Sequence, residues 1–268
     1  MQFIDRRLAA RLESVERIGQ IRYAEGLKLA KPQIEVAIEE IAGGHMVFTG
    51  PQSPIGRAIG LGLDGPVSAA DMERVETFYF SRGADAQIDV VPAADESLFA
   101  ELKQRPYRLL ELNNVMALEF DLSRRFHTQI EGIEIRRAGP EESLVCAEVL
   151  GRCFGGFSPE IAEAVAAMFA APALTFLAMT DGALVAVATG LLMEEAELLA
   201  LFGAGTLPAY RGRGIQTALF GARINAAKEK GCKLAVTVTR GGTTSQRNAE
   251  RLGFRVAYSK ATMIRARE

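Results

Sequence analysis

The fold of this chain is decided by residues 207–217, which read LPAYRGRGIQT. An apolar segment precedes this stretch, and after it apolar residues recur at helical spacing. These are Ile215, Ala218, Leu219, Ala222 and Ala226. Lys228, Lys230 and Gly231 are typical of a last helical turn and of the residue that ends a helix. The stretch therefore predicts a strand, a glycine-rich loop and a helix.

The loop before this helix has the properties of an anion-binding site. The first N–H groups of a helix have no partner within it, and Gly212 and Gly214 let the backbone approach a ligand closely. Arg211 and Arg213 add two positive charges. A pyrophosphate or several phosphates are the expected ligand, and a solvated turn whose arginines bind nothing is the alternative.

Two other phosphate-binding motifs fit the sequence poorly. A P-loop requires a lysine followed by serine or threonine, and no such pair follows Gly214. Residues 60–65 form a literal G-x-G-x-x-G, but Asp64 would face the phosphates and Pro66 removes an N–H donor.

The composition excludes several classes of protein. With 268 residues, 49% of them hydrophobic and 24% charged, the chain can bury a globular core. The net charge of −2 argues against dedicated nucleic-acid binding. The three cysteines form no C-x-x-C pair, which favours a reducing, cytoplasmic location. No apolar run is long enough to cross a membrane, and the start of the chain has no secretory pattern, so no membrane association is expected.

We predict no metal site, because His45 and His127 lie far apart and no metal-ligand spacing occurs. The polar stretch at residues 121–132 is the best candidate for a domain boundary, which gives domains at 1–130 and 131–268. The C-terminal domain is predicted to be an α/β unit with antiparallel strands that lead into a strand, a loop, a helix and a further strand.

The two halves also resemble each other in their order of glycines, helices and strands. Equivalent residues are separated by 143, 148 and 147 residues in the pairs Gly62 and Gly205, Gly83 and Gly231, and Tyr107 and Phe254. The shorter first spacing places a deletion of about five residues where the second half carries residues 209–213. The pattern predicts a tandem duplication in which only the second copy kept its loop. Two unrelated α/β segments that share turn glycines are the alternative.

From residue 208 the run P-x-Y-R-G-R-G-I, followed by a helix, the strand at 233–239 and a helix that ends in Leu252-Gly253-Phe254, resembles a GNAT superfamily N-acetyltransferase. The resemblance covers residues 133–263. It implies an α/β fold with a mixed sheet (α+β) and, with the duplication, tandem GNAT-like domains of which the first is degenerate. Because the first half lacks the anion-binding loop, we expect it to pack against the second and enclose the acceptor site.

The resemblance also implies acetyl-CoA as co-substrate. The strand that leads into the loop would splay from the next strand, so that the pantetheine arm lies between them, and the pyrophosphate would lie on the loop. The implied binding residues are Gly205, Thr206, Arg211, Gly212, Arg213, Gly214, Ile215, Gln216, Thr217 and Asn248. Gln216 stands where the family has glycine or alanine, and Ala249 stands where many members carry a tyrosine as general acid.

Acetyl transfer to an amine needs a group that accepts the ammonium proton. Glu197, at the start of the strand that leads into the loop, is the best candidate, followed by Glu194 and Glu195. A solvated acidic turn is the alternative for all three. Tyr258, Tyr210 and Ser245 are weaker candidates for the acid.

The expected function is therefore N-acetyl transfer from acetyl-CoA to a primary amine, either a small molecule or a peptide, by direct attack. The alternative is a non-catalytic, acyl-CoA-binding regulatory module. An RNA-binding protein is disfavoured, because no basic or aromatic run flanks the two loop arginines. Homo-oligomers are compatible with the sequence.

Overall fold

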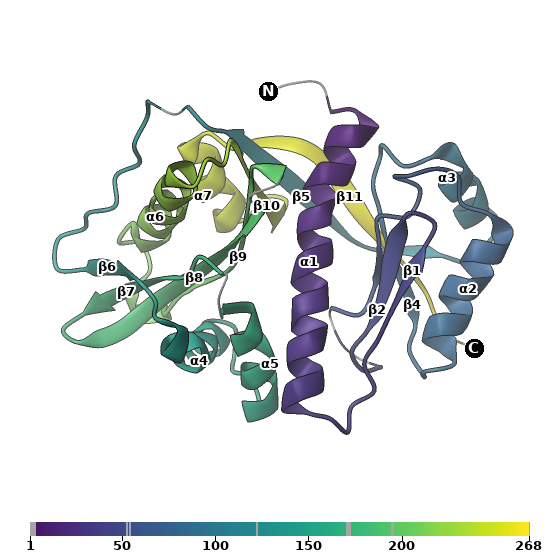
Figure 1. The fold of residues 1–268 in the computed structure, drawn as a ribbon, viewed down its shortest axis with the longest axis horizontal. Helices are drawn as coiled ribbons and strands as arrows, with labels where there is room; N and C mark the ends of the chain where they lie inside the picture. Colours follow the sequence, from purple (N-terminus) through teal and green to yellow (C-terminus); the bar gives the residue numbers. More distant parts are fainter. Residues whose placement is uncertain are drawn as a thin grey trace. The chain divides into compact units, whose positions relative to one another are not determined.

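The computed structural model describes residues 4–51, 53, 55–121, 123–169, 173–193 and 196–267 (Figure 1). The chain divides into two compact units. The C-terminal unit holds residues 116–255, and the N-terminal unit holds residues up to 115 together with those from 256 onward. Among the described residues, no helix combines the length and the apolar character needed to span a membrane.

The N-terminal unit is a mixed sheet with helices on both of its faces. In chain order its elements are α1 (Arg6–Ala30), β1 (Ala37–Ile41), β2 (Gly44–Phe48), β3 (Ala58–Ile59), α2 (Ala69–Phe80), β4 (Ala86–Val90), α3 (Glu96–Lys103), β5 (Arg108–Glu119) and β11 (Arg255–Arg265). Strand β2 is buried along its whole length. Met46 on β2 packs in the core with α2, while His45 lies on the other face and bonds Gln20 of α1.

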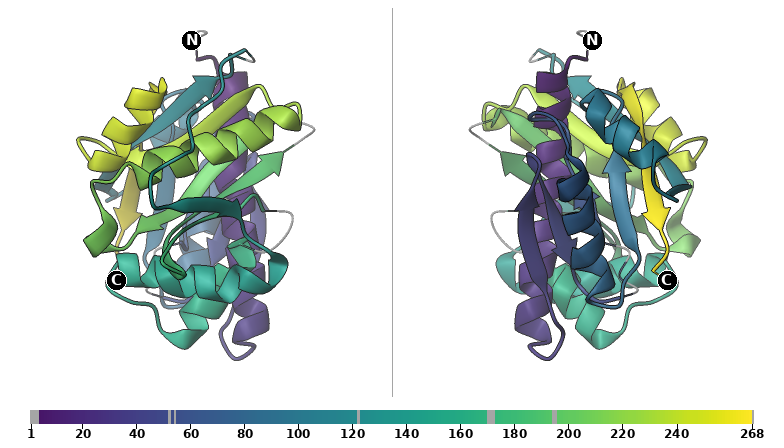
Figure 2. Two further views of the ribbon diagram at one scale, coloured as in Figure 1. Left: turned by 90° about the vertical axis from the view of Figure 1, so that its left-hand side faces the viewer. Right: turned by 90° about the vertical axis from the view of Figure 1, so that its right-hand side faces the viewer.

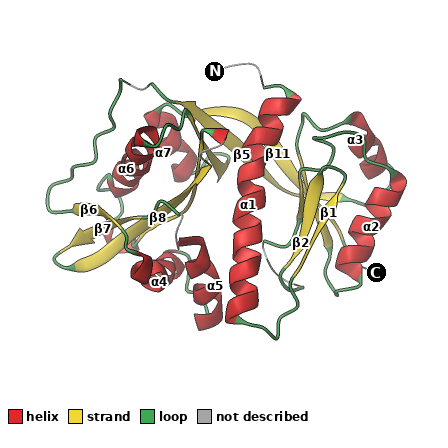
Figure 3. Ribbon diagram, viewed as in Figure 1, coloured by secondary structure: helices red, strands yellow, loops and turns green. Residues whose placement is uncertain are grey.

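The C-terminal unit has its helices and strands in the order that the sequence predicts (Figure 3). Its elements are β6 (Glu134–Arg137), the 3-10 turn η1 (Pro140–Glu142), α4 (Ser143–Cys153), α5 (Pro159–Phe169), β7 (Phe176–Thr180), β8 (Ala183–Met193), β9 (Leu198–Thr206), the 3-10 turn η3 (Pro208–Tyr210), α6 (Ile215–Glu229), β10 (Leu234–Arg240) and α7 (Thr244–Leu252). Helices α6 and α7 lie together on one face of its strands, and α4 and α5 lie on the opposite face (Figures 1 and 2).

The strand pairing supports the predicted duplication. In the N-terminal unit β1–β2 and β2–β3 are antiparallel and β3–β4 is parallel. In the C-terminal unit β7–β8 and β8–β9 are antiparallel and β9–β10 is parallel. A helix joins the parallel strands in both copies, so the chain contains two GNAT-like folds in tandem.

The predicted boundary at residue 130 differs from the division in the structure. Strand β11 follows the second copy in sequence, but it pairs with β4 of the first copy, from Ala261↔Val90 to Arg265↔Ala86. Strand β5, the last of the first copy, lies beside β10 of the second. The units therefore divide within β5 and at the start of β11.

Candidate functional site

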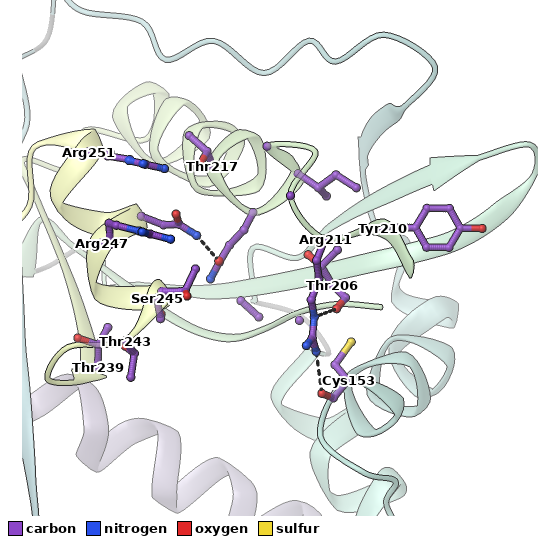
Figure 4. Close-up of a pocket in the computed structure, with 18 of the residues that line it drawn as sticks. Cys153, Thr206, Tyr210, Arg211, Thr217, Thr239, Thr243, Ser245, Arg247 and Arg251 are labelled. Atoms are coloured by element: carbon purple, nitrogen blue, oxygen red, sulfur yellow. Dashed lines mark hydrogen bonds between the residues drawn. The ribbon is translucent and has the colours of Figure 1, made fainter. Parts of the chain in front are cut away.

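The C-terminal unit contains a cavity of about 710 Å³ between the ends of β9 and β10 and the N-terminal ends of α6 and α7 (Figure 4). Ligand pockets in proteins commonly measure roughly 300–1,000 Å³. The described residues that line it are 153, 154, 204–206, 210–212, 214–217, 238–240, 243–245, 247, 248 and 251. All of them belong to the C-terminal unit.

The cavity exists because β9 leaves β10 part of the way along its length. The parallel pairing runs from Leu198↔Leu234 to Leu201↔Thr237 and then ends. After Phe202 the pairing of β9 with β8 shifts by one residue, and Gly203 has a φ of 52°. Residues 204–206 then line the cavity instead of pairing with β10. The backbone groups of these residues that do not pair with β10 can bond a ligand that lies along the strand, apart from the carbonyl of Thr206, which accepts from Nε of Arg211.

The loop and helix form the anion-binding geometry that the sequence predicts. Gly212 and Gly214 have φ values of 79° and 80°, a left-handed conformation that suits glycine. Gly214 is the N-cap of α6 and supplies no side-chain bond to the first helical N–H groups. A Cβ at Gly214 would meet no atom within 4 Å, so the loop is open on that side. The first-turn N–H groups of α6 can therefore bind an anion.

Arg211 and Arg213 differ in their surroundings. Nε of Arg211 donates to the carbonyl of Thr206 at 3.1 Å, and its Nη2 donates to the carbonyl of Cys153 at 3.2 Å. Arg211 thus ties the loop to β9 and to the end of α4 while it lines the cavity. Arg213 lies outside the lining, with its guanidinium carbon 6.0 Å from the centre of the Tyr210 ring.

Gln216 and Asn248, both predicted binding residues, are brought together by the fold. Nδ2 of Asn248 donates to Oε1 of Gln216 at 2.6 Å, which joins α7 to the first turn of α6. Both residues line the cavity, as do the predicted residues Gly205, Thr206, Ile215 and Thr217.

Three arginines of the cavity were missed by the sequence analysis. Arg240 ends β10, and Arg247 and Arg251 lie one turn apart on α7. None of the three has an ion pair or side-chain hydrogen bond within the described chain. Arg247 and Arg251 project toward the cavity from the side opposite Arg211 (Figure 4). The i, i+4 spacing on a polar helix face was the signal available in the sequence.

The predicted base Glu197 does not lie at the cavity. It immediately precedes β9, whereas the cavity is lined by the other end of that strand, about 25 Å away at 3.3 Å per residue. Its carboxylate lies 2.6 Å from Nζ of Lys233 on the surface. The extended strand thus separates Glu197 from this cavity, and the kinetics of a Glu197 variant test its predicted role as base. Glu194 and Glu195 lie outside the described residues.

The candidates for the general acid divide between the two units. Tyr258 is in the N-terminal unit, where its hydroxyl donates to Glu13 at 2.7 Å. Tyr210 and Ser245 line the cavity. Cys153 also lines it, but burial raises the pKa of its thiol, so the thiol is protonated at neutral pH. Among the described lining residues there is no aspartate, glutamate or histidine.

Residues 144–254 match the sequence model of the Acetyltransferase (GNAT) family. The match runs from the first turn of α4 to beyond the end of α7 and contains every residue that lines the cavity. It confirms the resemblance for the C-terminal copy. No curated protein matches the chain in sequence.

Solved structures share the fold over nearly the whole chain. A GCN5-related N-acetyltransferase from Kribbella flavida is 17% identical, with a TM-score of 0.67 over 96% of this chain and 95% of that chain. A tandem GNAT protein from the clavulanic acid biosynthesis pathway is 12% identical, with a TM-score of 0.63 over 90% of this chain and 86% of its own. At these identities the likeness establishes the fold, including its tandem arrangement.

Proposed function

We propose that this protein, whose residues 144–254 match the GNAT acetyltransferase family, is an acyl-CoA-dependent N-acetyltransferase with one active cleft in the C-terminal unit. The observation that carries the proposal is the position of Gly214. An open, left-handed glycine begins α6 at the wall of a cavity that continues between two diverging parallel strands. This arrangement suits a ligand that has a pyrophosphate at one end and a thin, amide-bearing arm at the other.

In this proposal, the amides of Gly214–Thr217 hold the pyrophosphate and the backbone of residues 204–206 bonds the pantetheine arm. Acetyl-CoA would supply an acetyl group as a thioester. Attack by the neutral amine nitrogen on its carbonyl carbon forms the C–N bond and breaks the C–S bond, and the leaving thiolate takes up, through water, the proton that the nitrogen loses. Strand N–H groups beyond the β9 bulge would stabilise the charge that develops on the carbonyl oxygen. The acceptor is a small-molecule or peptide amine.

A non-catalytic acyl-CoA-binding module is the second candidate. Ala249, fully buried on α7, stands where many members of the family carry a tyrosine as general acid. This observation favours the module. The two functions differ in one measurement. An enzyme releases coenzyme A steadily in the presence of acetyl-CoA and a panel of amines, whereas the module binds acetyl-CoA without any amine-dependent release.

Ligand specificity tests the cofactor assignment. Acetyl-CoA should raise the melting temperature, with about 2.7 kcal/mol of added stability at 100 times its Kd, while NAD and ATP should have much smaller effects. The absence of a shift at millimolar acetyl-CoA would contradict the proposal.

A further inference from the structure

Arg223 is a fully buried cation in the core of the C-terminal unit. It lies in the middle of α6, and its relative exposure is 0%. Its Nε donates to the carbonyl of Leu219 at 3.0 Å, and its Nη1 donates to the carbonyl of Thr189 at 2.6 Å. The guanidinium carbon lies 4.9 Å from the centre of the Phe220 ring.

This guanidinium has no carboxylate partner within the described residues, and its Nη2 has no hydrogen bond there. Burial lowers the pKa of Arg223 to about 9, so the group still carries its charge at neutral pH. An unpaired buried charge costs free energy that an apolar side chain of similar volume would not. Such departures from good core packing concentrate at functional sites, where they position other groups.

The residue that Arg223 holds marks the start of the β9 bulge. Thr189 pairs with Phe202, but Val187 pairs with Gly205, so β9 carries one extra residue opposite β8. Gly203 lies within this bulge, and a Cβ added there would approach Cγ2 of Thr189 to 2.9 Å. On the other side of β9, the pairing with β10 ends at Leu201, one residue before Phe202. The bulge and the separation of β9 from β10 therefore coincide.

We propose that Arg223 is a positioning residue for the cleft. By holding the carbonyl of Thr189 it fixes the bulge in β9, and the bulge aims residues 204–206 at the ligand instead of at β10. Thr189 is held from the opposite face as well, because its Oγ1 lies 2.8 Å from Oγ1 of Thr175. That residues 204–206 bind acetyl-CoA rests on the proposed function. The role of Arg223 in fixing the bulge can be tested without any ligand.

Amide hydrogen exchange in the ligand-free protein is the primary test. Arg223→Met removes the charge and the hydrogen bonds at similar volume. Loss of a bond from a charged donor should speed exchange at residues 202–206 by more than about tenfold relative to wild type, while residues 198–201 remain protected. The matched control is Ile224→Ala, which opens a cavity at the adjacent, fully buried residue of the same helix and should lower the melting temperature without selective loosening of residues 202–206.

Binding provides the second readout. Arg223→Met should raise the Kd for acetyl-CoA by about tenfold or more, with a melting temperature above that of Ile224→Ala, and Arg223→Lys should recover part of the affinity. If Arg223→Met fails to fold, Arg223→Gln takes its place with the same expected direction of change. Wild-type exchange at residues 202–206 in the variant, or equal loosening in Ile224→Ala, would overturn the inference. Failure of wild-type protein to bind acetyl-CoA would contradict the proposed function and leave the exchange test valid.

Discussion

Gly214 is the residue at which a side chain should disturb an anionic ligand most. Its left-handed φ of 80° and the open space beside it place its backbone against the cavity. Gly231, at the other end of α6, has a φ of 82° and equally open surroundings, but it lies outside the lining. The two glycines therefore form a matched pair, alike in backbone strain and different in access to the ligand.

Gly214→Asp should abolish stabilisation by acetyl-CoA, because it places a negative charge beside the N–H groups of α6. Gly231→Asp should keep that stabilisation. Each variant carries a backbone cost of about 1–2 kcal/mol, so both should melt a few degrees below wild type. Thermal denaturation with and without acetyl-CoA measures both effects. A ligand-induced shift of wild-type size in Gly214→Asp would mean that the loop is only a turn.

Glu197, the base that the sequence predicts, immediately precedes β9, at the end of the strand that does not line the cavity. Because Glu197 pairs with Lys233 on the surface, Glu197→Gln should leave kcat/KM and its pH profile unchanged and alter stability by less than about 1 kcal/mol. Steady-state kinetics over pH 6–9 with the best amine provides the check. A loss of about a hundredfold, which a general base would cause, would restore the sequence-based assignment.

Among the elements, α7 carries most of the cavity arginines that were not predicted from the sequence. The loop and α6 could be predicted because their signals are local, namely two glycines, a helical repeat and a terminating glycine. The cationic face of α7 could not be placed in the same way, since Arg247 and Arg251 reach the cavity only because α7 packs beside α6. Similarly, no local signal placed the separation of β9 from β10 at Leu201, although the family resemblance implied that these two strands splay apart.

The two α7 arginines should contribute to the affinity for coenzyme A through charge. Arg247→Ala combined with Arg251→Ala should raise the Kd by about tenfold or more at low salt, and by a smaller factor at high salt, because screening weakens the interaction. Arg152→Ala, at an exposed arginine of α4 outside the lining, is the control and should leave the Kd unchanged. Titrations at two salt concentrations test this, and equal affinities of the double variant and wild type would remove α7 from the binding surface.

At the scale of the whole molecule, the tandem pattern was predictable from glycine spacing. The pairing of β11, which follows the second copy, with β4 of the first copy was not. The pairing of β11 with β4 joins residues more than 170 positions apart, as in the pair Ala261↔Val90. Such long-range pairing leaves no local sequence signal. The polar stretch at 121–132 is consequently a connection after β5 and not the point at which the units divide.

In the first copy a backbone hydrogen bond joins the two segments that correspond to the cavity walls of the second copy. In the N-terminal unit, the N–H of Asp95 donates to the carbonyl of Gly62 at 2.8 Å. Asp95 is the N-cap of α3, as Thr243 is of α7, and Gly62 corresponds to Gly205 in the duplication. In the C-terminal unit Thr243 and Gly205 both line the cavity. A direct backbone hydrogen bond in the first copy therefore closes the space that corresponds to the cavity of the second copy.

The central claim is that the cleft of the C-terminal unit, and it alone, binds acetyl-CoA. Isothermal titration calorimetry of the full chain with acetyl-CoA tests this claim most directly, because it counts the sites. The account predicts one acetyl-CoA bound per chain and no saturable binding to Gly214→Asp. A stoichiometry of two, or saturable binding that persists in Gly214→Asp, would contradict it and place a working site in the N-terminal unit.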